Sequence, residues 1–167
     1  MRFRFLITAL LPLAFTACLQ GSDPITYPFV PIEETTFAAS LNVNLAASNK
    51  TATGLYYRDL TVGTGTTATS TSRVGVYYTG YRSDGSQFDF TASPSPTYQV
   101  NLGANPPESI PGFVEGIVGM KIGGTRQLII PPSLAYGAQG ATDRQTGQYV
   151  ILPNAVIIFT VQLVSVQ

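Results

Sequence analysis

The side chains most often used for catalysis are scarce in this chain. It has no His and a single Cys, Cys18, so it lacks the commonest acid–base group and the commonest metal ligands. No Ser-His-Asp set exists, and the nine acidic residues form no obvious catalytic pair along the sequence. The Gly-Thr-Gly run at 63–65 lacks the spacing and the following helix of a dinucleotide-binding loop. We therefore expect neither a metal nor a cofactor.

Aromatic side chains are the remaining candidates for a binding site. Flat apolar rings can enclose an apolar group and can pack edge to face around it. On composition alone the same rings could simply fill the core of a β-rich domain, and that alternative stays open at this point. The rings in question are Tyr78, Phe88, Tyr98, Phe113, Tyr136 and Phe159.

Strand patterns carry most of these rings. Apolar residues alternate with polar ones in short runs that end at Gly, Pro, Asp or Ser, which is typical of β-strands. The pair Asp84-Gly85 lies between two such runs and predicts a hairpin. The runs cover residues 55–62, 73–81, 87–90, 97–102, 125–130 and 155–166.

One segment, residues 111–120, has a helical pattern. Phe113, Ile117 and Met120 recur at helical spacing, and Pro111 suits the first turn. Gly119 or Gly123 suits the end of the helix, and the two glycines before them weaken it, so packing must hold it in place. One sheet packed on one short helix gives an α+β architecture.

The first eighteen residues have the features of an export signal. Arg2 and Arg4 precede an apolar stretch at 5–15, which is shorter than the ~20 residues that a membrane span needs. Small residues then precede Cys18, as in the lipobox of bacterial lipoproteins, although Phe15 stands where Leu is usual. We expect Cys18 to be lipidated. An ordinary secretory signal and a buried core helix are the alternatives.

A segment rich in Pro, Gly, Ser and Thr follows this signal. Pro24, Pro28 and Pro31 interrupt regular structure repeatedly, which favours a flexible spacer, with a short strand over 37–45 as a local alternative. The expected organisation is a signal peptide at 1–17, a lipidated Cys and flexible tether at 18–50, and a folded domain at 51–167.

Charge excludes one class of partner. Lys+Arg 9 and Asp+Glu 9 give a formal charge of zero, so the chain has no basic footprint for nucleic acid. With the export signal, this predicts a lipoprotein anchored by Cys18 in the cell envelope, facing the extracytoplasmic side, or else a secreted protein. Nothing in the sequence indicates an oligomer, so we expect a monomer.

Short motifs occur in order along the folded domain. They read V-Y-Y-T-G at 76–80, D-G-S-Q-F-D at 84–89, I-P-G-F-V-E-G at 110–116, I-P-P-S-L-A-Y-G at 130–137 and I-L-P-N-A at 151–155. In this order the motifs resemble those of FKBP-type peptidyl-prolyl cis–trans isomerases. Any one of them is weak evidence, but the set in register is specific.

The resemblance implies an α+β fold, in which an antiparallel half-barrel sheet of about five strands wraps over one short helix. It places the active site in the cavity between the sheet and the helix. At the floor Phe113 replaces the usual Trp, which keeps a flat apolar base but loses area and the indole N–H. The implied catalytic residues are Asp89, Tyr136 and Phe88, and the implied substrate-binding residues are Tyr78, Tyr98, Ile110, Phe113, Ile151 and Phe159.

The implied activity is rotation about X–Pro bonds during the folding of exported proteins. Amide resonance sets a barrier of ~18–20 kcal/mol, and the twisted transition state has a smaller dipole than the planar amide. An apolar pocket therefore disfavours the planar form more than the twisted one. The resemblance also implies a macrolide as a ligand besides proline-containing polypeptides. The alternatives are a non-catalytic peptide-binding or chaperone module and a purely structural envelope lipoprotein.

Overall fold

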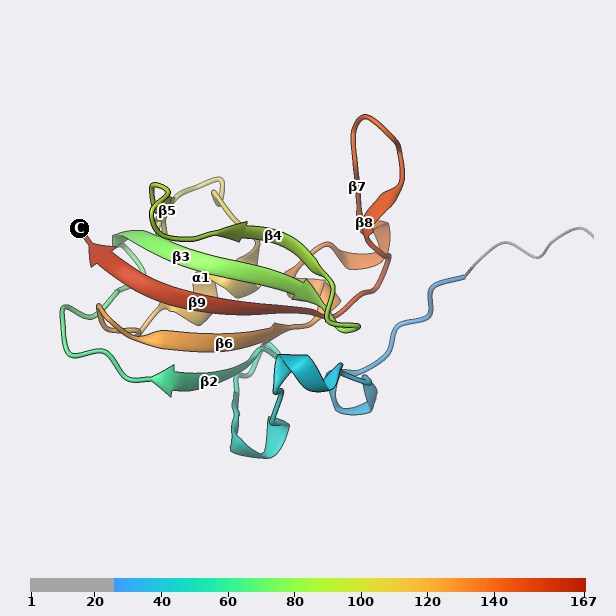
Figure 1. Cartoon of the computed structure of the whole chain (residues 1–167), viewed down its shortest axis with the longest axis horizontal. Helices are drawn as coiled ribbons and strands as arrows, with labels where there is room; N and C mark the ends of the chain where they lie inside the picture. The colour runs from blue at the N-terminus through green and yellow to red at the C-terminus, as the bar shows by residue number, and fades with distance from the viewer. Residues whose placement is uncertain (1–25) are drawn as a thin grey trace, which may run out of the picture.

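A computed structural model describes residues 26–167 of the chain (Figure 1). The signal peptide and Cys18 predicted above lie outside the described residues. The strands are β1 Asn49–Lys50, β2 Tyr56–Thr61, β3 Arg73–Arg82, β4 Gln87–Thr91, β5 Tyr98–Asn101, β6 Thr125–Ile130, β7 Ala141–Thr142, β8 Tyr149–Ile151 and β9 Ile157–Val166. The α-helix α1 is Pro111–Ile117, and 3-10 helices cover Ile32–Glu34, Ala39–Leu41, Leu45–Ala47, Pro132–Leu134 and Gly137–Gln139.

The main sheet is antiparallel and runs in the order β1-β2-β6-β9-β3-β4. Strand β5 pairs with the first half of β3 and β4 with its second half, so β4 and β5 follow one another along the same edge. Helix α1 lies behind this twisted sheet in Figure 1, and β7 and β8 form a separate hairpin that projects beside it. Within residues 26–167 the sheet packs on one α-helix, which confirms the predicted α+β half-barrel, and the sheet has seven strands where about five were expected.

The burial pattern along β9 shows that both faces of the sheet are covered at this strand. Ile157, Phe159, Val161 and Leu163 alternate along it and are at most 5% exposed, as the period of two predicts. Ile158 points to the opposite face, yet it is only 1% exposed. A further layer must therefore cover the outer face at this end of the sheet.

That layer is the N-terminal strap, which we define as residues 27–50. Its Ile32 and Leu41 are 4% and 7% exposed and pack in one cluster with Ile129 and Ile158. Full burial of each such side chain stabilises a fold by about 1.5–3 kcal/mol. The description of this segment as a flexible tether is therefore wrong for the strap, because its apolar side chains cover the outer face of the sheet.

The strap forms 3-10 turns where a short strand at 37–45 was the alternative. Polar contacts reinforce it. The buried side-chain amide of Gln127 donates to the carbonyl of Leu41 at 2.8 Å, and Lys50 pairs with Glu33 at 2.6 Å. The folded unit thus extends well before residue 51.

Helix α1 approaches the sheet closely because two of its residues have no side chain. A Cβ on Gly112 would lie 2.4 Å from Ile130, and a Cβ on Gly116 would lie 2.5 Å from Leu128. Both distances are too short for real side chains, so these glycines allow the contact with β6. This confirms that packing holds a helix of weak intrinsic propensity. Among residues 26–167, no helix has the length and apolar character to cross a membrane.

Candidate active site

A cavity of about 300 Å³ opens between the sheet and the start of α1. Its walls come from β3, β4, β5, β9, the helix and the turn after β6, which the fold brings together from distant parts of the chain. The lining residues are Tyr78, Asp89, Tyr98, Glu108, Ser109, Ile110, Phe113, Tyr136 and Phe159.

The floor of the cavity is a cluster of edge-to-face rings. Phe113 and Phe159 are 2% and 5% exposed, and their centroids are 5.2 Å apart. The ring of Tyr78 lies 5.6 Å from Phe113 and 5.5 Å from Tyr98. The rings therefore belong to the core and also surround an open space. The alternative left open by composition, that the rings only fill the core, therefore does not hold.

Gly80 makes room for the ring of Phe159 and for the neighbouring ring of Phe88. It lies on β3, and a Cβ at this position would be 2.7 Å from the Phe88 ring and 2.8 Å from the Phe159 ring. Any side chain here would push both rings out of place. Gly80 is part of the V-Y-Y-T-G motif, but only the structure shows what its missing side chain allows.

Tyr78 and Asp89 form the polar edge of the cavity. The register of β3 and β4 pairs Gly80 with Asp89, which brings the Asp89 carboxylate to the Tyr78 hydroxyl at 2.8 Å. Burial, and then the hydrogen bond to Asp89, raises the pKa of Tyr78. The hydroxyl therefore remains a donor, and the hydrogen bond orients the carboxylate.

Two hydrogen-bond donors on residues that line the cavity have no protein acceptor among the residues that the structure describes. One is the backbone N–H of Ile110, the residue that precedes α1. The other is the hydroxyl of Tyr136, whose pKa is raised by burial and by the nearby Asp89. An extended peptide offers carbonyl groups that suit both donors.

The predicted site residues divide between this cavity and an adjoining groove. Phe88 and Ile151 line the groove, which has a volume of about 430 Å³ and shares Asp89 and Tyr136 with the cavity. Its far wall is the β7–β8 hairpin, defined here as residues 141–151. All the other predicted catalytic and substrate-binding residues line the cavity itself.

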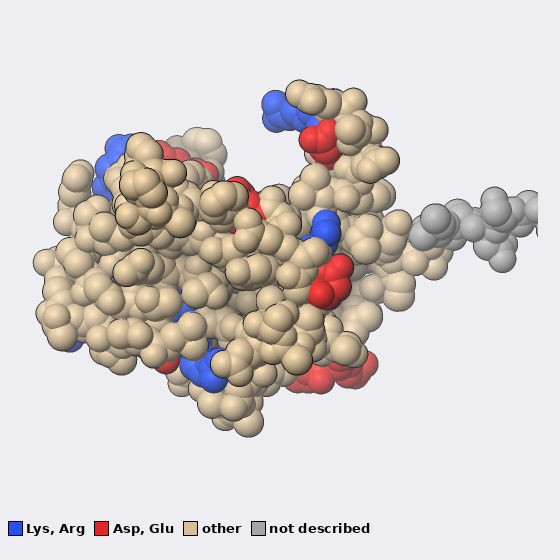
Figure 2. Space-filling model, viewed as in Figure 1, with Lys and Arg blue, Asp and Glu red and all other residues tan. Residues whose placement is uncertain are grey.

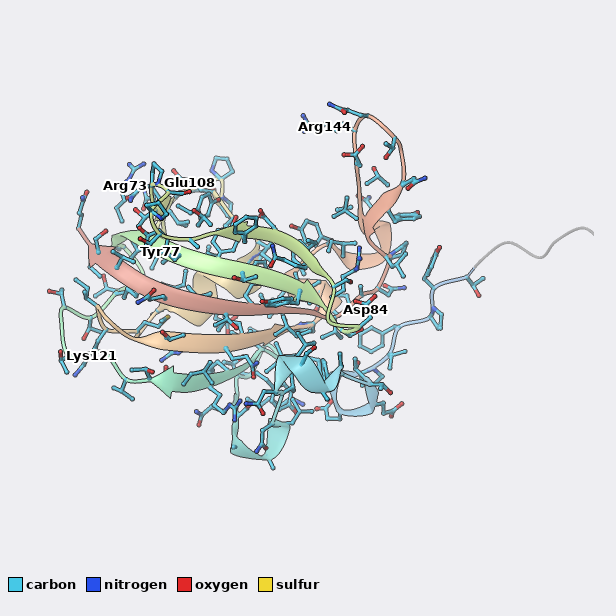
Figure 3. All side chains as sticks on the ribbon, in the orientation of Figure 1. Arg73, Tyr77, Asp84, Glu108, Lys121 and Arg144 are labelled. Carbon is cyan, nitrogen blue, oxygen red and sulfur yellow. The ribbon has the colours of Figure 1, made fainter. Side chains whose placement is uncertain are left out.

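Glu108 and Ser109 also line the cavity, and sequence reasoning missed both. The carboxylate of Glu108 accepts from the backbone N–H of Asn101 at 2.9 Å, and its carbonyl accepts from Tyr98 Oη at 3.4 Å. The only signal for them was their position immediately before the I-P-G-F motif. Figure 3 shows Glu108 at the end of the molecule that carries Arg73 and Tyr77.

Comparison with known proteins finds the same family along the chain. Residues 64–164 match the model of the FKBP-type peptidyl-prolyl cis-trans isomerase family. The FK506-binding protein of Neisseria meningitidis serogroup B is 38% identical over 113 residues, which is 68% of this chain and 96% of that protein. FK506-binding protein 4 of Dictyostelium discoideum is 41% identical over 112 residues, or 67% of this chain, but this match spans only 28% of that relative.

Two solved structures are also similar to this chain. A peptidyl-prolyl cis-trans isomerase from Pseudomonas syringae pv. tomato has a TM-score of 0.62 and 29% identity, covering 77% of this chain and 86% of that one. FkpA from Escherichia coli has a TM-score of 0.60 and 32% identity, covering 72% of this chain and 52% of that one. Residues 64–164 make up more than half of this sequence, and the chain accordingly belongs to the FKBP-type peptidyl-prolyl cis–trans isomerase family.

Proposed function

We propose that this protein accelerates cis–trans rotation about X–Pro bonds in polypeptides. The observation that carries the proposal is a cavity with an apolar floor of aromatic rings and a polar edge, where Ile110 N–H and Tyr136 O–H have no acceptor among the described residues. The prolyl ring lies on Phe113 and Phe159. The two donors bind carbonyls of the substrate on either side of the rotating bond.

The catalytic effect in this proposal comes from the environment of the amide. The planar amide has the larger dipole, and the apolar floor solvates it poorly compared with water. The twisted transition state loses less on entering the same site, so its relative free energy falls. Asp89, oriented by Tyr78, faces the rotating carbonyl. No proton transfer is needed, which agrees with a chain that has no His.

A protease-coupled assay tests this function directly. The full chain, at micromolar concentration, should accelerate isomerisation of Leu-Pro and Phe-Pro tetrapeptides in proportion to its concentration. A rate equal to the uncatalysed background would contradict the proposal. In that case, suppression of aggregation of an unfolded protein would favour peptide binding without catalysis, for which the groove beside the cavity offers additional surface.

We also propose that a macrolide of the FK506 type occupies the same cavity. Several relatives are named FK506-binding proteins, and the cavity presents the same rings to any apolar ligand. Competition between the macrolide and a tetrapeptide tests this. A macrolide that binds without lowering the isomerase rate would place its site elsewhere.

The export signal suggests where the protein acts. We propose that it is a lipoprotein of the cell envelope, anchored through Cys18 on the extracytoplasmic side, where it acts as a monomer on exported proteins. Residues 1–18 support this by sequence alone. Mass spectrometry of the mature N-terminus, with Cys18→Ala as the control, should find a fatty-acylated Cys18. A mature chain that begins at another residue would favour simple secretion.

A further inference from the structure

The β7–β8 hairpin forms the outer wall of the groove beside the proposed active site. It projects from the body of the molecule, with Arg144 at its tip (Figures 1 and 3). Figure 2 shows charged side chains at this tip and a hollow between the hairpin and the body. Only a two-residue strand and a three-residue strand pair within it, so contacts at its base must determine its position.

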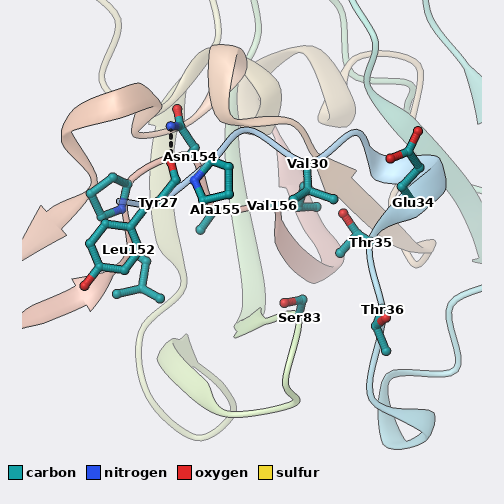
Figure 4. Close-up of a pocket in the computed structure, with 12 residues that line it drawn as sticks. Tyr27, Val30, Glu34, Thr35, Thr36, Ser83, Leu152, Asn154, Ala155 and Val156 are labelled. Carbon is teal, nitrogen blue, oxygen red and sulfur yellow. Dashed lines mark hydrogen bonds between the residues drawn. The ribbon is translucent and has the colours of Figure 1, made fainter. Parts of the chain in front are cut away.

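The N-terminal strap makes one of these contacts. The ring of Tyr27 lies 5.8 Å from the ring of Tyr149 at an interplanar angle of 67°. The carbonyl of the same Tyr27 accepts a hydrogen bond from Asn154 Nδ2 at 2.7 Å, as Figure 4 shows. One residue of the strap therefore contacts β8 through its ring and the following turn through its backbone.

Asn154 connects the strap to a catalytic element. Its backbone N–H donates to the carbonyl of Gly137 at 2.8 Å, and Gly137 directly follows Tyr136. Asn154 has a φ of 57°, in the left-handed region that Asn tolerates better than most side chains. Its side chain and its backbone thus hold two segments that lie 110 residues apart in the sequence, from Tyr27 to Gly137.

Arg82 makes a second contact with the hairpin. Its Nη1 donates to the carbonyl of Val150 at 2.9 Å, and its Nε donates to Ser86 at 2.6 Å. The strap also contacts the turn between β3 and β4, because the N–H of Ala38 donates to the carbonyl of Ser83 at 2.8 Å. The base of the hairpin is thus fixed between the β3–β4 turn and the strap.

We propose that Tyr27 and Asn154 are positioning residues for substrate recognition. Through them the strap holds the hairpin at the distance from the cavity that a longer substrate requires. This inference depends on the proposed isomerase function. A tetrapeptide fills the cavity and needs little of the groove. An unfolded protein extends past the prolyl residue into the groove, so its binding depends on the hairpin.

The test compares two substrates on variants of the full chain. Tyr27→Ala should lower kcat/KM by about three- to tenfold for a refolding protein whose slow step is proline isomerisation, through a higher KM. The value for a tetrapeptide should stay within about twofold of wild type, since the cavity is unchanged. Tyr27→Phe keeps the ring and should restore the wild-type value. Asn154→Gly keeps the left-handed backbone, removes the side-chain donor, and should act like Tyr27→Ala.

Phe29→Ala is the matched control, because Phe29 is an aromatic residue of the same strap but is 60% exposed. It should behave like wild type with both substrates. An equal loss on both substrates in Tyr27→Ala, or the same loss in Phe29→Ala, would overturn the inference. Hydrogen exchange gives a readout independent of catalysis: the Asn154 amide should exchange faster in Tyr27→Ala while β9 is unchanged. Unchanged exchange at Asn154 would overturn the inference, whether or not the wild-type protein is active. An inactive wild-type protein would contradict the isomerase proposal, which is a separate result.

Discussion

The hydroxyl of Tyr78 donates a hydrogen bond to the carboxylate of Asp89 across the β3–β4 hairpin, with 2.8 Å between the oxygens. The Tyr78 ring is at the same time part of the cavity floor, 5.6 Å from Phe113. One side chain therefore joins the apolar base of the site to the Asp89 carboxylate. Substitution of Asp89 can therefore test whether its carboxylate takes part in the mechanism.

Asp89→Val should lower kcat/KM for a tetrapeptide by about tenfold or more, the usual cost of a hydrogen bond to a charged group. The thermal unfolding temperature should change little, because Asp89 is exposed at the edge of the cavity. Asp84→Asn, a change to a carboxylate in the turn of the same hairpin, should retain full activity. Equal activity in Asp89→Val and wild type would remove Asp89 from the mechanism.

Gly80→Ala should lower both stability and activity. The added methyl would overlap the rings of Phe88 and Phe159, and overpacking of this kind costs about 1–3 kcal/mol of unfolding free energy. Denaturant unfolding and the tetrapeptide assay measure the two effects. Thr79→Ala is the control, since its side chain points to the other face of β3. A stable and fully active Gly80→Ala protein would mean that the rings can move without consequence.

The isomerase rate should be flat between about pH 6 and pH 9.5. The reactive groups include no His, and the ordinary tyrosine pKa is about 10. Burial raises the pKa of Tyr78 and of Tyr136, so their neutral, hydrogen-donating forms persist to still higher pH. A pH profile of kcat/KM checks this. A decline between pH 8 and pH 9.5 would show that one of these hydroxyls ionises earlier than its surroundings predict.

Phe113→Trp should tighten the binding of an FK506-type macrolide by about fivefold, because the larger ring buries more apolar area. The cavity adjoins this ring, so the extra atoms have space to enter. Titration calorimetry measures the change in Kd. Phe113→Leu, which keeps an apolar side chain but removes the flat ring, should weaken binding. Unchanged affinity in both variants would show that the macrolide does not contact the floor.

Ile32→Ala should lower the free energy of unfolding by about 2 kcal/mol or more. Ile32 is 4% exposed and packs with Ile129 and Ile158 on the outer face of the sheet. Phe29→Ala, on an exposed side chain of the same strap, should cost less than about 0.5 kcal/mol. Equal stability of the two variants would mean that the strap is a free tether after all.

Much of the fold could be predicted because local patterns are enough for it. The period of two along β9 predicted which side chains share one face of the strand, and Pro111 with Phe113 and Ile117 predicted α1. The predicted strand at 125–130 has the observed bounds of β6. The motifs carry Tyr78 and Tyr136 as well as Phe113, so the sequence also indicated rings that line the cavity.

The tertiary structure alone decided how distant segments meet. The apolar residues of the strap follow no period, so nothing local showed that Ile32 covers Ile158 or that Tyr27 contacts Tyr149. The motifs imply a single site, and the fold adds a groove beside the cavity that Phe88 and Ile151 line. The Phe88 ring still packs edge to face against Phe159 of the cavity floor, with 5.5 Å between the centroids. Periodicity along a chain determines which face of an element is apolar. What covers that face depends on where the chain returns, and this is a property of the whole fold.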